Sequence, residues 1–159
     1  MKSVPFAELQ SEFEARVNKI VWCNVATVNA QGRPRSRILH PIWEGAIGWI
    51  TTRPTSYKAA DLAKNPYVSL AYVADIAKPV YVDCKAEWID DLAEKQRVWN
   101  LVKNAPAPVG FDPEPMYKSA IDPSFGVLKL TPWRLEVYSF PGDSLVWHAE
   151  RSAKTESAS

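Results

Sequence analysis

The chain has 159 residues, of which 47% are hydrophobic and 23% are charged, so it is long enough for one domain with its own core. Its formal net charge of +1 excludes a global field that would attract nucleic acid or an anionic membrane surface. The two cysteines and two histidines form no paired motif, which argues against a structural zinc site and indicates buried thiols in a reducing compartment.

The N-terminal segment turns polar and acidic at once and lacks the apolar core of a signal peptide. No run of residues approaches the roughly 18 apolar residues that a membrane span requires. We therefore expect a cytoplasmic protein that has neither a membrane nor a nucleic acid as its partner.

The first part of the chain predicts one helix followed by strands that are joined by tight turns. Apolar residues recur at three- and four-residue spacing over residues 4–19, which predicts an amphipathic helix. Strand-like runs follow near residues 20–28, 35–43 and 46–52. The turns between these runs are short and carry Gly32 and Gly45, so we expect antiparallel hairpins.

The rest of the chain alternates short elements with one long loop. A helix is expected over residues 55–64, because Asn65-Pro66 ends it. Further elements are expected as strands at residues 67–73 and 79–88, a helix at 90–103, and strands at 125–131 and 133–140. Residues 104–124 hold five prolines and form a long irregular loop, which is usually a functional or interface element.

These elements predict a mainly β (α+β) fold with flanking helices. Six or seven short strands, mostly antiparallel, tend to close into a barrel, because closure removes exposed strand edges. We expect one domain over residues 1–148, followed by a disordered tail over residues 149–159.

Two arginines on the second strand are the first candidates for a binding site. Alternation along the strand places Arg35, Arg37 and Leu39 on one face. Two guanidinium groups one pleat apart suit an anion, since each can bind a phosphate through two parallel hydrogen bonds. A solvated strand face would show the same pattern, so both interpretations stay open at this point.

Hydroxyl groups and a lysine follow the next strand, where a helix begins. Thr51, Thr52, Thr55 and Ser56 precede Lys58 in this segment. Backbone amides at a helix N-terminus attract a phosphate, and hydroxyl groups with one lysine complete such a cradle. An ordinary capped helix with an exposed lysine is the alternative. The proximity of this segment to the arginine strand, across one hairpin, favours a phosphate site.

Four segments of the chain resemble the pyridoxamine 5'-phosphate oxidase-like flavoproteins. They read RSRIL (Arg35–Leu39), WITT (Trp49–Thr52), SYKAADLAKNPYVSLAYV (Ser56–Val73) and LTPWRLEVYSF (Leu130–Phe140). The resemblance extends over about residues 6–138. It implies a six-stranded antiparallel split β-barrel and a homodimer with two FMN molecules in clefts at the subunit interface.

The resemblance also implies which residues hold the cofactor. The arginines of the second strand, with Ser56 and Lys58, would hold the phosphate, and Thr51 and Thr52 would contact the ribityl chain or the phosphate. The backbone from Arg37 to Leu39 would run beside the isoalloxazine ring. The complete implied set is Arg35, Arg37, Ile38, Leu39, His40, Ile50, Thr51, Thr52, Ser56, Tyr57 and Lys58.

The chain departs from the vitamin oxidases of this family in two places. These enzymes carry a lysine, which binds the substrate phosphate, where this chain has His40. They also carry an Arg-x-His pair after the closing strand, whereas residues 143–148 here read DSLVWH. Both departures argue against oxidation of pyridoxamine phosphate. His40 could instead donate a proton or bind a substrate oxygen, and a structural histidine is the competing interpretation.

The first hypothesis is an FMN-dependent oxidoreductase that moves a hydride between a nicotinamide or other reductant and a small molecule. The second hypothesis is an enzyme that uses a deazaflavin coenzyme, because a related split-barrel branch binds this coenzyme with a similar Ser-x-Lys phosphate site. A non-catalytic flavin-binding stress protein and a small β protein without a cofactor are the remaining alternatives.

Overall fold

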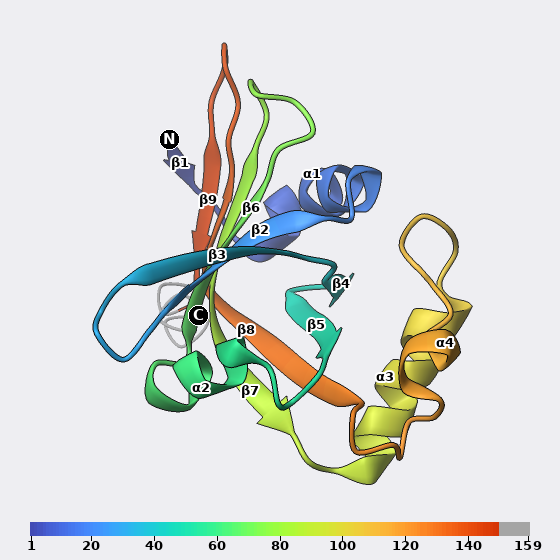
Figure 1. Ribbon diagram of the computed structural model, residues 1–159. Coiled ribbons are helices and arrows are strands. Elements are labelled where there is room, and N and C mark those ends of the chain that lie inside the picture. Colours follow the sequence, from blue (N-terminus) through green and yellow to red (C-terminus); the bar gives the residue numbers. More distant parts are fainter. Residues whose placement is uncertain (150–159) are drawn as a thin grey trace, which may run out of the picture.

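This computed structural model describes residues 1–149 of the chain (Figure 1). These residues contain nine strands and four helices. The strands are Lys2–Ser3 (β1), Cys23–Val28 (β2), Pro34–Leu39 (β3), Ile42–Glu44 (β4), Ile47–Thr52 (β5), Tyr67–Tyr72 (β6), Val80–Ile89 (β7), Gly126–Val137 (β8) and Leu145–His148 (β9). The helices are Phe6–Lys19 (α1), Tyr57–Lys64 (α2), Leu92–Asn104 (α3) and Glu114–Tyr117 (α4). None of these helices is long and apolar enough to cross a membrane.

The nine described strands form one sheet, which is antiparallel apart from the pair β1 and β9. Its hydrogen-bonded order is β1-β9-β8-β7-β6-β2-β3, and β5 pairs with both β4 and β8. The six long strands β2, β3, β5, β6, β7 and β8 correspond to the strands of the predicted barrel. The predicted mainly β fold with flanking helices is confirmed.

The barrel is open between β3 and β5. β3 pairs with β2 alone, whereas β5 pairs with β4 and β8. The single strand predicted over residues 35–43 breaks at His40-Pro41, so its second part leaves β2 and pairs with β5 as β4. A proline has no amide to donate to a ladder, which makes it a natural place for such a break. The break opens the barrel next to His40.

The two strands predicted at residues 125–131 and 133–140 are one strand, β8. Pro132 suggests a break in the sequence, yet it pairs opposite Cys84 beside a register shift at Asp83/Cys84 of β7. On the other side of β8, the pairing with β5 ends at Leu130 and that with β9 begins at Arg134. The missing proline amide therefore costs no ladder hydrogen bond on that side.

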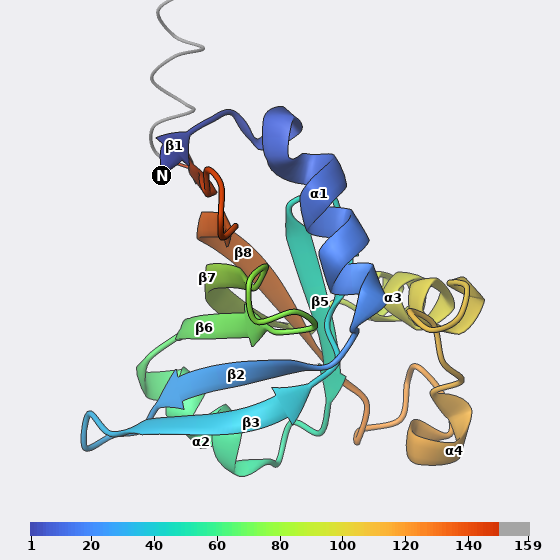
Figure 2. The same ribbon diagram turned by 90° about the horizontal axis from the view of Figure 1, so that it is seen from above.

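Two apolar clusters stabilise the fold. The larger lies under α1, whose Leu9, Phe13 and Val17 are buried against the sheet (Figure 2). The Phe13 ring contacts the Trp43 ring edge-on, with centroids 5.1 Å apart, and the Trp43 indole donates a 2.9 Å hydrogen bond to the Tyr72 hydroxyl. The second cluster lies beyond β5, where α3 and the following loop pack around the fully buried Phe125.

Both cysteines are buried free thiols, as the sequence predicts. Burial raises the pKa of the Cys23 thiol to about 12, and burial likewise raises the pKa of Cys84. Thiols that stay protonated are poor nucleophiles, so the two cysteines are structural. The tail expected over residues 149–159 lies outside the described residues apart from Ala149, and the domain boundary at residue 148 stays a prediction.

Candidate cofactor site

A cleft of about 700 Å³ opens where the barrel is split. The end of β3, the end of β5 and the proline-rich loop after α3 form its walls. The lining residues are Val21, Trp22, Leu39, His40, Thr51, Thr52, Pro108, Gly110, Phe111, Asp112, Met116 and Tyr117. A volume of this size and an apolar wall with a few polar groups are typical of small-molecule sites.

Arg37 points from β3 toward α2 and is already paired. Its guanidinium donates hydrogen bonds to the Thr27 hydroxyl at 2.6 Å and to the Asp61 carboxylate at 3.1 Å. The Thr27 hydroxyl in turn donates to Asp61 at 3.1 Å. This cluster fixes the Arg37 side chain beside the first turns of α2.

Lys58 lies next to Arg37 and is the unusual group of the site. Its residue is only 9% exposed. Burial, and then the neighbouring Arg37 charge, lowers the pKa of the Lys58 ammonium. Within residues 1–149 no acceptor forms a hydrogen bond or an ion pair with this ammonium group. A lysine of such low exposure that lacks an acceptor is a candidate contact for an anion from outside the chain.

Ser56 adds a second unsatisfied group at the same place. It is the N-cap residue of α2, with the extended backbone of a cap, yet its side chain accepts no hydrogen bond from the helix. Its Oγ is buried and has no partner among the described residues. The N-terminus of α2, Ser56, Lys58 and Arg37 together form what we call the anion corner.

His40 directly follows the C-terminal end of β3 and lines the cleft. Its ring lies between Trp22, with centroids 5.2 Å apart, and Phe111, with centroids 5.1 Å apart. Burial lowers the pKa of the imidazole, and a hydrogen bond with the Val109 backbone offsets part of this shift. The Nε2 atom is buried and has no partner among the described residues.

The remaining residues of the implied cofactor set lie around these two groups. Leu39, Thr51 and Thr52 line the cleft. Arg35 is exposed on β3, and Ile38 is 64% exposed on the opposite face. The Ile50 side chain is in the core, so only its backbone can face a ligand. Tyr57 is 90% exposed at the first position of α2.

Several residues of the site escape sequence reasoning. Asp61 follows Lys58 by three residues on α2, so helical spacing places both residues on one face of this helix. A carboxylate on that face could have been considered as a partner for the arginines of the second strand. Trp22, Phe111 and Met116 reach the cleft only through the fold, and no local pattern in the sequence connects them.

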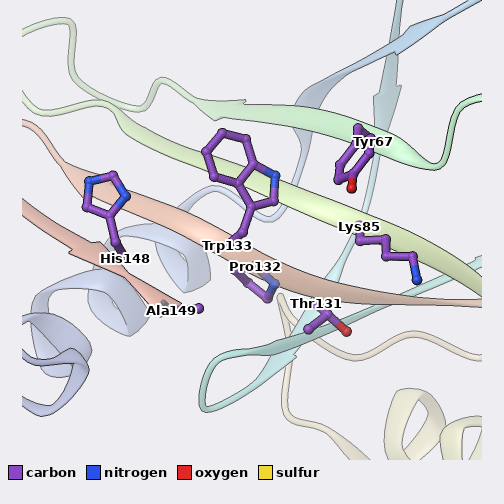
Figure 3. Close-up of a pocket in the computed structure, with 7 residues that line it drawn as sticks. All are labelled: Tyr67, Lys85, Thr131, Pro132, Trp133, His148 and Ala149. Carbon is purple, nitrogen blue, oxygen red and sulfur yellow. The ribbon is translucent and has the colours of Figure 1, made fainter. Parts of the chain in front are cut away.

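A second pocket, of about 640 Å³, lies on the sheet over β6 to β9. Figure 3 shows His148, Trp133 and Tyr67 following one another across this face, with Lys85 and Thr131 beside them. Lys85 is about half exposed and bonds the Glu87 carboxylate at 3.2 Å. His148 therefore lies apart from the split that contains the cleft.

The sequence can now be compared with known families. A family model described as pyridoxamine 5'-phosphate oxidase matches residues 9–138. The chain belongs to this family. A pyridoxine/pyridoxamine 5'-phosphate oxidase of Mannheimia succiniciproducens is 32% identical over 91 residues, which are 55% of this chain and 43% of that protein. The chain thus spans less than half the length of that curated relative.

Solved structures support the same fold at lower identity. A Clostridium acetobutylicum protein related to general stress protein 26 of B. subtilis superposes with a TM-score of 0.72 at 18% identity, over 93% of this chain and 99% of that one. A pyridoxamine 5'-phosphate oxidase-related, FMN-binding protein of Nostoc punctiforme gives a TM-score of 0.67 at 18% identity, over 91% of each chain. The resemblance found in the sequence is confirmed at the level of family and fold.

Proposed function

We propose that this family member binds FMN at a homodimer interface and acts as a flavin-dependent oxidoreductase on a small molecule. The observation that carries the proposal is Lys58, a residue only 9% exposed, whose ammonium has no anionic partner within residues 1–149 and lies beside a second cation, Arg37. A phosphate group would satisfy this ammonium group and the unpaired Ser56 hydroxyl together.

The rest of the implied FMN set fits this placement. β3 pairs on one side only, so backbone groups from Arg37 to Leu39 are available to a flat ring along the split. Thr51 and Thr52 lie across the cleft and offer hydroxyl groups between the ring and the anion corner. When bound, FMN supplies the hydride chemistry, while these residues position it and the apolar cleft wall excludes water.

The homodimer is part of the proposal and rests on the exposed apolar surface near the site. Trp22 is 56% exposed and Ile38 is 64% exposed, and both lie on or beside the open edge of the split. Large apolar side chains gathered at one edge are typical of subunit interfaces. The proposal predicts a dimer by light scattering at micromolar concentration, and a monomer at that concentration would contradict it.

Oxidation of pyridoxamine phosphate is not the proposed reaction. His40 stands where the vitamin oxidases carry a phosphate-binding lysine. The second histidine, His148, lies on β9 in the other pocket. None of the described residues that line the cleft is a lysine or an arginine, and Asp112, the one charged group of the lining, is paired with Lys103 at 3.7 Å.

Cofactor binding and turnover are tested in two steps. The purified protein is mixed with excess FMN and desalted, and the flavin absorbance that stays with the protein is measured. Oxidation of NADH or NADPH by the loaded protein, with a quinone or nitroaromatic acceptor, then tests catalysis. Retained FMN without turnover would favour the non-catalytic flavin-binding alternative. Failure to retain FMN, with binding of the deazaflavin coenzyme, would favour the second cofactor.

A further inference from the structure

Arg37 is held in place by two groups from neighbouring elements. Its guanidinium donates a 2.6 Å hydrogen bond to the Thr27 hydroxyl on β2 and a 3.1 Å hydrogen bond to the Asp61 carboxylate on α2. The Thr27 hydroxyl donates a third bond, of 3.1 Å, to the same carboxylate oxygen. We call this closed set of three bonds the arginine clamp. The other N–H groups of the guanidinium bond no described residue, so they remain free for a ligand.

The two anchors of the arginine clamp are fixed by the fold. Thr27 is 2% exposed on β2, a strand that pairs with β3 on one side and with β6 on the other. Asp61 precedes Leu62, which is buried in the larger apolar cluster and thereby docks α2 on the sheet. The side chains of Arg37 and Asp61 are 22% and 15% exposed, so water screens this ion pair only in part. Anchors on regular elements position a side chain more precisely than loop residues do.

Arg37 needs such anchors because it lies next to a second cation. After burial, the Arg37 charge is the second cause that lowers the pKa of Lys58, so the two like charges are close. An arginine side chain has many rotamers, and β3 pairs with β2 alone. Repulsion from Lys58 would therefore favour rotamers that turn the guanidinium into solvent. The arginine clamp removes this freedom before a ligand arrives, and such preorganisation lowers the entropic cost of binding.

We infer that Asp61 and Thr27 are positioning residues of the anion corner, which hold Arg37 so that a phosphate group at the start of α2 meets both cations of the corner. The inference rests on the proposed function, since it concerns the phosphate end of the same cofactor site. It predicts the opposite of simple charge counting, by which neutralising Asp61 would strengthen phosphate binding. An ion pair that only attaches α2 to the sheet would affect stability and leave phosphate binding unaltered.

The test measures the ratio of the dissociation constants for riboflavin and FMN, because the two ligands differ only in the phosphate. Thr27→Val keeps the charge of the site and nearly its shape, and removes the bridging hydroxyl. We expect the ratio to fall about 3- to 10-fold in Thr27→Val, as the loss of one net hydrogen bond predicts, and to recover in Thr27→Ser. Asp61→Asn is expected to lower the ratio by a similar factor, although it makes the site more positive.

Two further variants assign the effect to Arg37. In Arg37→Met the ratio is expected to be low already, and adding Thr27→Val should lower it no further. Ser69→Ala is the matched control, since Ser69 also donates a hydrogen bond to a carboxylate, that of Asp83 at 2.7 Å, on the exposed surface of the sheet. Its ratio is expected to equal that of the wild-type protein. An unchanged or raised ratio in either Thr27→Val or Asp61→Asn would overturn the inference.

Inorganic phosphate separates this outcome from that of the proposed function. Its binding is followed through the backbone amide signals of the first turn of α2 in NMR spectra of the FMN-free protein. A wild-type protein that binds phosphate there but retains no FMN would contradict the proposed function alone, and the phosphate affinities of the same variants, with the same expected losses, then test the arginine clamp. FMN retention with the wild-type ratio in these variants would contradict the inference alone. Absence of both phosphate and FMN binding would contradict both. Thermal unfolding shows which variants are folded, and Asp61→Asn carries the test if Thr27→Val is not.

Discussion

Two lysines at different sites of this molecule, Lys85 in the pocket of Figure 3 and Lys58 in the anion corner, are satisfied differently. Lys85, in the pocket of Figure 3, is about half exposed and bonds Glu87 at 3.2 Å. Lys58, in the anion corner, is 9% exposed and has no acceptor within the described residues. A solvated, paired lysine needs no ligand, whereas a buried, unpaired one does. The combination of burial and a missing partner, more than the amount of charge, therefore distinguishes the proposed ligand site.

The largest effect is expected from replacing the lysine of the anion corner. Lys58→Met is expected to weaken FMN binding by about 10- to 100-fold, because it removes a charge-assisted contact to the phosphate that is worth about 1.5–3 kcal/mol. Quenching of FMN fluorescence measures this change. Lys85→Met is the matched control and is expected to leave the affinity unchanged. Equal losses in both variants would remove the distinction between the anion corner and the pocket of Figure 3.

The same pair of variants separates binding from folding. Without FMN, Lys58→Met is expected to raise the free energy of unfolding, because it removes a buried charge that has no partner. Lys85→Met exchanges an exposed, paired lysine and is expected to change stability little. Urea unfolding of the FMN-free proteins gives both values. A destabilised Lys58→Met would mean that the ammonium already has a stabilising role in the chain.

The next largest effect is expected in the proline-rich loop after α3. This loop forms one wall of the cleft and does not line the pocket of Figure 3. Gly110→Ala is expected to lower the free energy of unfolding by about 1–3 kcal/mol, the usual cost of overpacking. The reason is that the new methyl group would lie 2.0 Å from the Ala105 carbonyl oxygen. Urea denaturation measures the loss. A change below about 0.5 kcal/mol would indicate that the loop can move away from α3 and does not fix the cleft.

A smaller effect is expected at the paired arginine of the anion corner. Arg37→Met leaves Asp61 with only the Thr27 hydroxyl and is expected to cost about 1–2 kcal/mol of stability, reduced from the value of a deeply buried pair because both side chains keep partial exposure. Arg37→Met combined with Asp61→Asn is expected to recover part of this loss. Additive costs in the double-mutant cycle would show that the two side chains do not interact.

The smallest effect is a change of stability with pH that arises from His40. Burial lowers the pKa of the folded imidazole below its usual 6.5, so the unfolded chain binds more protons in that interval. The contribution is therefore present above pH 6.5 and is lost as the pH falls through the folded value. Unfolding at several pH values between about 7 and 5 measures the slope. His40→Phe should flatten it, while Asp112, the charged residue of the cleft, stays unchanged in this variant.

The sequence predicts the elements whose signals are local. The hairpin of β2 and β3 follows from its turn. There the Asn29 side chain accepts hydrogen bonds from two backbone amides, and Gly32 takes a φ of +74°. Ser56 and Lys58 are also recognisable, because they lie two residues apart at a helix start. Pro132 gives the wrong boundary, since the pairing passes from Asp83–Arg134 to Cys84–Pro132 and leaves Trp133 of β8 as an extra residue, which only the register reveals.

The cleft depends on long-range packing and could not be predicted in the same way. Trp22, His40 and Phe111 are far apart in the chain and meet only because β3 ends at the split and the proline-rich loop returns to it. Alternation places Arg37 on the correct face of its strand, but its pairing with Asp61 depends on how α2 docks. The grouping of Arg37, Ser56 and Lys58 was therefore foreseeable in outline, and the lining of the cleft was not.

The measurement that tests the anion corner most directly is a parallel titration of the protein with FMN and with riboflavin. The two ligands share the isoalloxazine ring and the ribityl chain, and only FMN carries a phosphate. If Lys58 and Ser56 bind that phosphate, FMN is expected to bind at least about 10-fold more tightly, and Lys58→Met should remove most of the difference. Equal affinity of the wild-type protein for FMN and riboflavin would contradict a phosphate site at the start of α2.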